Sequence, residues 1–349
     1  MKTGNKKIIS LLLITLLIST LLLTTGCGKD DGGKDKVFKW KLQSSYGPGD
    51  QTWDIQMPMI VDAIEKETNG RIKIKTYTPG SICEPEQAPA SVENGMLDCA
   101  LSTAGDTGQT IPAAYAEQGI PFFWEDQEDM YETYYKYGLL EFLRKHYKEH
   151  NIYYGMPVPN GVYSLMTNFP VKKASDLKGR KIRSYSSWGQ FVKNLGGSPV
   201  NIPGGDIYMA MKLGTVDGCL FTFAELYNAK LSEVTDYVME QPASGSGFVS
   251  FIISKKAWDE LPKDLQKAVN KALKDCYHPI MKKCIAYDKK AREHAKKKGV
   301  KFIKISEKNM KTFWEAGEDT AKQVEKQYPE AKEGINIVRK WHDEKEKGK

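Results

Sequence analysis

The chain has few of the side chains that hold metal ions or perform catalysis. It contains 5 histidines in 349 residues, all in charged stretches that favour a helix face in contact with water. The patterns Gly-x-Ser-x-Gly and His-Glu-x-x-His are absent, and no Gly-rich loop precedes Lys-Ser or Lys-Thr. The sequence therefore lacks the arrangements of common hydrolases, zinc enzymes and nucleotide-binding enzymes, and we predict a protein that is not an enzyme.

Cysteine is scarce, and its spacing excludes two common uses. Of 6 cysteines, all but Cys27 lie far from the N-terminus, and no Cys-x-x-Cys or Cys/His spacing typical of zinc is present. Cys276 and Cys284 share one predicted helix and are about 12 Å apart at its rise per residue, which exceeds the reach of a disulfide. We interpret the later cysteines as small buried hydrophobic residues, at positions 83, 99, 219, 276 and 284.

Charge of one sign is not concentrated in any long stripe. The chain has 51 Lys and Arg against 44 Asp and Glu, for a net charge of +7, and the two signs are interleaved. The dense run of Lys296, Lys297 and Lys298 falls at a predicted helix end, where cations interact favourably with the helix dipole. A nucleic-acid-binding protein would carry a clustered basic stripe with interleaved aromatic residues. We therefore predict a solvated surface and no nucleic-acid partner.

Long apolar runs are confined to the N-terminus. Lys2, Lys6 and Lys7 precede an apolar run over 8–23, a pattern that predicts an export signal at residues 1–26, removed from the mature protein. The run ends at Thr-Thr-Gly-Cys, and a small residue before Cys27 is typical of bacterial lipoproteins, although Thr24 stands where Leu is usual. An uncleaved membrane anchor is the alternative, but the run is shorter than the roughly 20 residues of a spanning helix.

The segment after Cys27 is polar and rich in glycine. Residues 27–36 show no periodicity, so we expect a flexible tether. A diacylglycerol on the Cys27 thiol would hold the protein on the membrane. The predicted location is the outer face of the cytoplasmic membrane, or the periplasm if the cell has an outer membrane.

From residue 37 onward, strand and helix patterns alternate. The β-α-β-α-β rhythm up to residue 101 predicts a parallel sheet, and a long aromatic helix is expected over 127–147. A second strand-helix series follows from 152 to 254. A charged helical region broken at Pro262, one strand and two amphipathic helices complete the chain. The length and the two series favour two α/β lobes with a ligand cleft between them.

Six short motifs are spread through residues 38–328. The most specific is Asp-Leu-Lys-Gly-Arg-Lys-Ile-Arg at 176–183, and the longest begins Asp-Ile-Tyr and ends Val-Asp-Gly at 206–218. The others are Thr-Asn-Gly-Arg-Ile-Lys-Ile at 68–74, Val-Glu-Asn-Gly-Met-Leu-Asp at 92–98, Gly-Ile-Pro-Phe-Phe at 119–123 and Trp-Asp-Glu-Leu-Pro at 258–262. In their types and order these motifs resemble those of the DctP family, the solute-binding proteins of TRAP transporters.

The resemblance implies a two-lobed α/β fold like that of periplasmic binding proteins, with long connecting helices. Residues 37–155 would form mainly the first lobe and 156–255 mainly the second. Residues 256–349 would form a long connecting helix and C-terminal helices that pack across both. It also implies a small organic acid as ligand, TRAP permease subunits as membrane partners and an ion gradient as driving force. A sensor protein that presents an organic acid to a membrane receptor is the alternative.

Arg183 is the main candidate for ligand binding. It ends the 176–183 motif, where the resemblance implies a two-pronged salt bridge with the ligand carboxylate. A guanidinium group suits this role because its planar fork matches a carboxylate and stays charged when it is desolvated. Without the resemblance, an ordinary surface Arg at a sheet edge would be the simpler interpretation.

The neighbouring positions depart from the best-known relatives. Tyr163 stands where sialate binders carry a second Arg, and Leu220-Phe221 stands where keto-acid binders carry Glu-Trp. Leu220 cannot bind a cation, so we predict no metal and no cofactor. The resemblance thus implies one Arg beside aromatic walls, formed by Phe221, Tyr163 and Trp188. We interpret the ligand as a monocarboxylate with an apolar or aromatic body.

Three of these assignments have ordinary structural alternatives. Trp188 could simply pack a helix on the sheet. Ser44 and Thr103 correspond to family positions that face the ligand after strand ends, but both also suit common turn chemistry.

Overall fold

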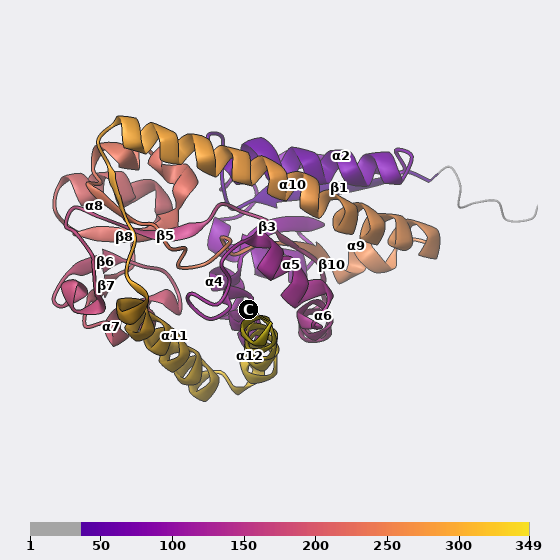
Figure 1. Ribbon diagram of the computed structural model, residues 1–349. Coiled ribbons are helices and arrows are strands. Elements are labelled where there is room, and N and C mark those ends of the chain that lie inside the picture. Colours follow the sequence, from indigo (N-terminus) through magenta and orange to yellow (C-terminus); the bar gives the residue numbers. More distant parts are fainter. Residues whose placement is uncertain (1–35, 349) are drawn as a thin grey trace, which may run out of the picture. The chain divides into compact units, whose positions relative to one another are not determined.

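Two mixed β-sheets organise the chain from Phe38 onward (Figure 1). The computed structural model describes residues 36–348. The chain separates into residues 1–37 and one compact unit from Phe38 to Lys349. The predicted signal peptide (1–26), Cys27 and nearly all of the predicted tether therefore lie outside the described residues. Among residues 36–348, no helix is both long and apolar enough to cross a membrane.

The first sheet has the strand order β2-β1-β3-β10-β4. β1 pairs in parallel with β2 and β3, as the sequence predicts, whereas β10 runs antiparallel to β3 and β4. The apolar residues of β1 face the core and Lys39 faces solvent, which matches the alternation in the sequence. The strands are β1 Phe38–Ser44, β2 Ile72–Tyr77, β3 Cys99–Thr103, β4 Ile152–Val158 and β10 Val249–Ser254.

The second sheet has the order β11-β9-β5-β8-β6-β7. β5 is antiparallel to both β8 and β9, and the other pairs are parallel. The strands are β5 Tyr163–Thr167, β6 Lys181–Arg183, β7 Ser198–Val200, β8 Gly218–Thr222, β9 Tyr237–Met239 and β11 Lys301–Ile303.

The chain passes between the sheets more often than the sequence alone suggests. It leaves the first sheet after β4, and it returns after β9 to place β10 between β3 and β4. The expected second lobe, 156–255, therefore contains a strand that belongs to the first sheet. Directly after such a crossing the chain forms an antiparallel strand, which is β5 in the second sheet and β10 in the first.

The connecting helices follow the predicted pattern with one exception. The single aromatic helix expected over 127–147 is wrong: α5 Gln127–Tyr135 and α6 Leu139–Glu149 are separate helices. Gly138 lies between them with φ 96°, a backbone conformation that glycine adopts without strain. The other helices before residue 255 are α2 Met57–Glu67, α3 Ala88–Glu93, α4 Ala104–Thr107, α7 Trp188–Asn194 and α8 Ile207–Lys212.

Short 3-10 and π-helical turns fill several connections. A π-helical turn precedes α2, and Asp50 accepts a hydrogen bond from the Thr52 amide at its start. The short turns are η1 Thr52–Gln56, η2 Pro85–Gln87, η3 Pro112–Gln118, η4 Ala174–Leu177, η5 Gly204–Asp206, η6 Phe223–Leu226, η7 Leu231–Glu233 and η8 Pro329–Ala331.

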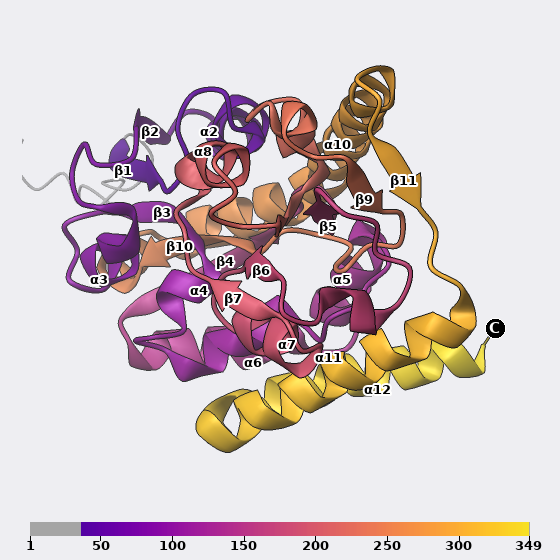
Figure 2. The same ribbon diagram turned by 90° about the vertical axis from the view of Figure 1, so that its left-hand side faces the viewer.

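The C-terminal helices cover both sheets (Figures 1 and 2). α9 (Lys255–Asp259) is a short helix, and Pro262 directly precedes α10 (Lys263–Lys297), which runs for 35 residues. α10 packs against α2 of the first sheet and against η6 of the second. α11 (Glu307–Gln327) packs on α7, and α12 (Lys332–Lys347) packs on α5, α6 and η3. The long helix thus contacts both lobes, while α11 and α12 each lie chiefly on one.

Most cysteines are buried, as the sequence predicts. Cys99, Cys219, Cys276 and Cys284 are buried and unpaired, and burial raises the pKa of the Cys219, Cys276 and Cys284 thiols to about 12. Cys83 departs from the prediction, because its side chain is partly exposed. It lies in the loop after β2, where the Gln43 amide donates to its carbonyl oxygen at 2.7 Å.

Candidate functional site

A small cavity lies between the two sheets. Its lining comes from loops and strand ends of both sheets and includes Arg183, Phe221, Tyr163, Trp188 and Thr103. Its volume is about 70 Å³. Gln118 of the first lobe and Tyr185 of the second both line it, so the two lobes meet around the cavity.

Arg183 occupies the second-sheet side of the cavity at the end of β6. Its side chain is 5% exposed, its Nε donates to the Ile202 carbonyl oxygen at 2.9 Å, and its Nη1 donates to the Leu220 carbonyl oxygen at 3.2 Å. The guanidinium carbon also lies 5.1 Å from the centroid of the Phe221 ring. These contacts fix the plane of the group and leave other N–H donors available.

The Arg183 charge has no acidic partner nearby. Among residues 36–348, no Asp or Glu side chain forms an ion pair with it, and its partners are carbonyl oxygens and an aromatic ring. A buried charge is unfavourable unless it is paired. Arg183 therefore has the chemistry of an anion-binding group, with a charge that its carbonyl and ring contacts do not neutralise.

Aromatic rings from both lobes form the cavity wall. The ring centroids of Tyr163 and Trp188 are 5.2 Å apart, and Phe248 lies 5.5 Å from Tyr163 and 5.7 Å from Trp188. Burial raises the pKa of Tyr163 to about 12, although nearby Arg183 opposes the shift. Trp188 also packs against Phe191 in its own helix, so it serves the core and the cavity at once.

The first lobe contributes polar groups to the cavity. Thr103 caps α4: its Oγ1 accepts from the Asp106 amide at 3.2 Å and donates to the Asp106 carboxylate at 2.7 Å. Asn160 lies in the β4–β5 crossing, and its Oδ1 accepts from the Gly161 amide at 2.7 Å. Thr103 and Asn160 both line the cavity, so neutral polar groups share its wall with the Arg183 cation.

Ser44 does not line the cavity. It is fully buried, and its Oγ accepts from the Tyr46 amide at 3.0 Å. Tyr46 itself does line the cavity. Ser44 therefore takes part in a turn, which is the alternative interpretation of this residue. Its hydroxyl holds the backbone of Tyr46, a lining residue that was not predicted from the sequence.

A short segment after Arg183 fastens the lobes together. The Tyr185 hydroxyl donates to the Asp106 carboxylate, the Gln118 amide donates to Ser186 Oγ at 2.8 Å, and Ser187 donates back to Gln118. Burial raises the pKa of Asp106, while the hydrogen bonds from Tyr185 and Thr103 oppose this. We call residues 185–187 the interlobe clasp.

Gly105 allows the clasp to close. A Cβ atom at this position would lie 2.1 Å from Cε1 of the Tyr185 ring, far inside van der Waals contact. Ser186 has φ 55°, a left-handed conformation uncommon for a residue other than glycine. The close approach of the lobes therefore depends on a missing side chain in one and a turned backbone in the other.

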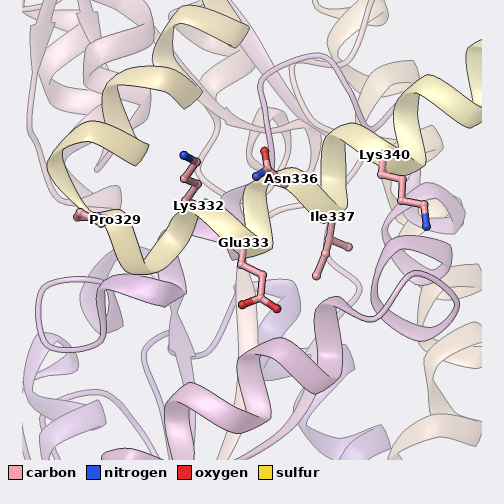
Figure 3. Close-up of a pocket in the computed structure, with 6 residues that line it drawn as sticks. All are labelled: Pro329, Lys332, Glu333, Asn336, Ile337 and Lys340. Carbon is pink, nitrogen blue, oxygen red and sulfur yellow. The ribbon is translucent and has the colours of Figure 1, made fainter.

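Another hollow on the surface is lined by one short stretch of the chain. The hollow in Figure 3 is lined from Pro329 to Lys340 along η8 and α12, and its side chains leave one helix in different directions. Within residues 36–348, no group of three His, Cys, Asp or Glu side chains is arranged to hold a metal ion. Leu220, at the position considered for a metal ligand, is buried and offers Arg183 its carbonyl oxygen.

The fold and this cavity define a two-lobed solute-binding protein, and comparison with known proteins agrees. The model of bacterial extracellular solute-binding protein family 7, DctP, matches residues 44–327. The chain belongs to this family, the solute-binding proteins of TRAP transporters. Because these are substrate-binding proteins, the chain is not an enzyme. The family predicted from the six motifs is thus confirmed, and so is the separate prediction that the protein is not an enzyme.

Individual relatives are distant in sequence. A solute-binding protein of Chromohalobacter salexigens is 24% identical over 217 residues, 61% of this chain and 63% of that protein, so the match spans less than two thirds of its length. A monocarboxylate 2-oxoacid-binding periplasmic protein of Nostoc is 24% identical over 278 residues, 78% of this chain and 75% of that one. A TRAP solute-binding protein of Desulfovibrio salexigens, solved with orotic acid, has a TM-score of 0.79 at 19% identity, covering 88% and 99% of the two chains.

Proposed function

We propose that this chain captures a small monocarboxylate with a flat apolar or aromatic body outside the cytoplasm and delivers it to TRAP permease subunits. The buried guanidinium of Arg183, with no acidic partner among residues 36–348, is the observation that carries this proposal. A ligand carboxylate would supply the missing charge and accept the remaining N–H donors in a bidentate pair.

The single cationic side chain favours one carboxylate over two. Arg183 is the one Lys, Arg or His among the described residues that line the cavity. A second carboxylate would be desolvated without a counter-charge, which is strongly unfavourable. Tyr163, Trp188 and Phe221 instead offer ring faces to an apolar or planar body.

The ligands of two relatives support this class. The Nostoc protein is described as binding monocarboxylate 2-oxoacids, and the Desulfovibrio protein was solved with orotic acid, a planar ring with one carboxylate. We therefore assign ligand contact to Arg183, Phe221, Tyr163 and Trp188. We assign Thr103 to the first-lobe side of the cavity and Ser44 to a supporting position behind Tyr46.

We also propose the cellular arrangement expected from the N-terminus. Residues 1–26 would be removed as a signal peptide, Cys27 would carry the lipid, and residues 27–36 would link it to the body. The first lobe would comprise 37–155 together with β10, the second the remainder of 156–255, and the helices after 255 would connect them. Mass spectrometry of the mature protein from its native membrane tests this, because a diacylglycerol on Cys27 adds a defined mass.

Thermal-shift screening tests the ligand assignment. We expect orotate or a 2-oxo monocarboxylate to raise the Tm of the wild-type protein and to leave the Tm of Arg183→Ala unchanged. Arg180→Ala is the matched control, since Arg180 belongs to the same motif but packs on the Phe169 ring outside the cavity. Stabilisation by succinate or sialic acid alone, or undiminished stabilisation of Arg183→Ala, would overturn the proposal.

A further inference from the structure

A second group of polar side chains is buried where α10 passes between the lobes. Asp288 of α10 is 5% exposed, Glu225 of η6 is 6% exposed, and Gln51, before η1, is 2% exposed. Asp50 lies beside Gln51 and is partly buried. The two lobes and the helix that joins them thus each contribute to one group.

Asp288 ties α10 to the first crossing between the sheets. Its Oδ2 accepts from the Val162 amide at 2.7 Å, whereas its Oδ1 is buried with no hydrogen-bond partner among the described residues. Both amide atoms of Gln51 are also buried, and neither has a hydrogen-bond partner within the part of the chain that the structure describes. Asp288 Oδ1 and Gln51 Nε2 each lie 2.7 Å from the place a Cβ on Gly161 would occupy, so they converge on the space that this glycine leaves.

Glu225 brings the second lobe into the same group. It faces the side-chain amide of Asn228, whose Oδ1 accepts from the Tyr287 hydroxyl of α10. Burial raises the pKa of Glu225 to about 8, and the negative charges of Asp50 and Asp288 add to the shift. The first lobe, the second lobe and α10 are therefore coupled through their charges.

Burial also raises the pKa values of the carboxyl groups of Asp288 and Asp50. Burial raises the pKa of Asp288 to about 7, and the Val162 amide and Arg292 oppose it. Arg292 shares its charge with Glu240, which lies 3.5 Å away. The further titratable or charged groups that face the cluster are Tyr46, Asp54, Tyr227, Cys284, Tyr287 and Lys290.

We propose that Asp50, Glu225 and Asp288 form a proton-binding site where α10 passes between the lobes, a place that we call the hinge. This site favours the closed lobes when it is protonated and the open lobes when it is ionised. A protonated carboxyl can donate a hydrogen bond to a buried acceptor such as the Gln51 Oε1 atom. Ionised, the three groups repel one another and require water, which lobe opening can supply. The site is separate from the ligand cavity, because none of the three residues lines it.

The direction of the pH effect follows from the raised pKa values. A carboxyl whose pKa is higher in the closed form favours closure below its open-form pKa, and that contribution is lost as pH rises through the closed-form pKa. With closed-form pKa values of about 7 for Asp288 and about 8 for Glu225, and ordinary carboxyl pKa values of about 4 in the open form, the change falls between roughly pH 4 and 8. Each unit of pKa difference between the two forms changes the closed-to-open ratio about tenfold.

Spin-label distances between the lobes test this without a ligand. In a Cys83→Ser background, labels at Ser81→Cys in the first lobe and Lys212→Cys in the second report lobe separation. We expect the short-distance population to dominate at pH 5.5 and to fall at pH 8.5. We expect Glu225→Gln and Asp288→Asn, made separately, each to reduce this pH dependence by tenfold or more in the population ratio.

Two carboxyl variants serve as controls. Glu117 is buried inside the first lobe, where it accepts hydrogen bonds from Tyr154 and Ser250. Glu293 is exposed on α10. Glu117→Gln and Glu293→Gln should keep the wild-type pH dependence of the distance. A distance distribution independent of pH, or equal pH dependence in all four variants, would overturn the proposal. Circular dichroism of each variant identifies any that fail to fold, and either hinge variant alone suffices for the test.

Discussion

Replacing Gly105 by alanine should prevent full closure of the lobes. The added Cβ would lie 2.1 Å from Cε1 of Tyr185, whereas carbon atoms in contact are about 3.5–4.0 Å apart. The ring would have to move by more than 1 Å and would lose its hydrogen bond to Asp106. A hydrogen bond to a charged group contributes about 1.5–3 kcal/mol, so closure should become about 10- to 150-fold less favourable.

Two further variants separate this clash from other effects. Gly189→Ala is the matched control, because its nearest neighbour, Cβ of Pro199, would be 3.6 Å away in ordinary contact. In Tyr185→Ala the clash cannot occur, so adding Gly105→Ala to it should have little further effect, as a double-mutant cycle would show. The lobe distance and the affinity for orotate are the readouts. Closure of Gly105→Ala to the wild-type extent, with Tyr185 present, would refute the reasoning.

Further predictions concern stability and reactivity. Burial raises the pKa of Glu117 to about 7; its contribution to stability should therefore be lost as pH rises through 7, and Glu117→Gln should flatten the Tm between pH 5 and 8. Gly245→Ala should lower the free energy of unfolding by several kcal/mol, because its Cβ would lie 2.3 Å from the Asp126 backbone; an unchanged Tm would contradict this packing. Among the cysteines of residues 36–348, iodoacetamide should modify Cys83 under native conditions and spare the four buried thiols. Peptide mass spectrometry checks this, and modification of a buried cysteine at the same rate would contradict it.

Local sequence predicted the parts of the fold that depend on periodicity. The alternation in β1, the break at Pro262 and the helices before and after it all follow from residue spacing and backbone chemistry. The split at Gly138 was missed because the aromatic pattern continues through it, although a glycine is the usual signal for such an end. The position of β10 could not be derived, since strand order depends on contacts far apart in the chain.

The candidate site was predictable where a motif carries it. Arg183 could be assigned because the 176–183 motif fixes its position in the strand, and the structure places it at the cavity. Tyr46, Asn160 and Phe248 were missed as lining residues, because they lie in loops that become neighbours only when the two sheets meet. For Ser44 the sequence left two interpretations open, since a strand-end hydroxyl can face either a ligand or its own turn, and its Oγ accepts from the Tyr46 amide.

A crystal structure of the protein with a bound monocarboxylate, such as orotate, tests the central claim most directly. We predict that the ligand carboxylate will accept two hydrogen bonds from the Arg183 guanidinium, with N···O distances of about 2.7–2.9 Å. Its body should lie between Phe221 and the pair formed by Tyr163 and Trp188. A carboxylate bound away from Arg183, with that guanidinium still unpaired, would contradict the account.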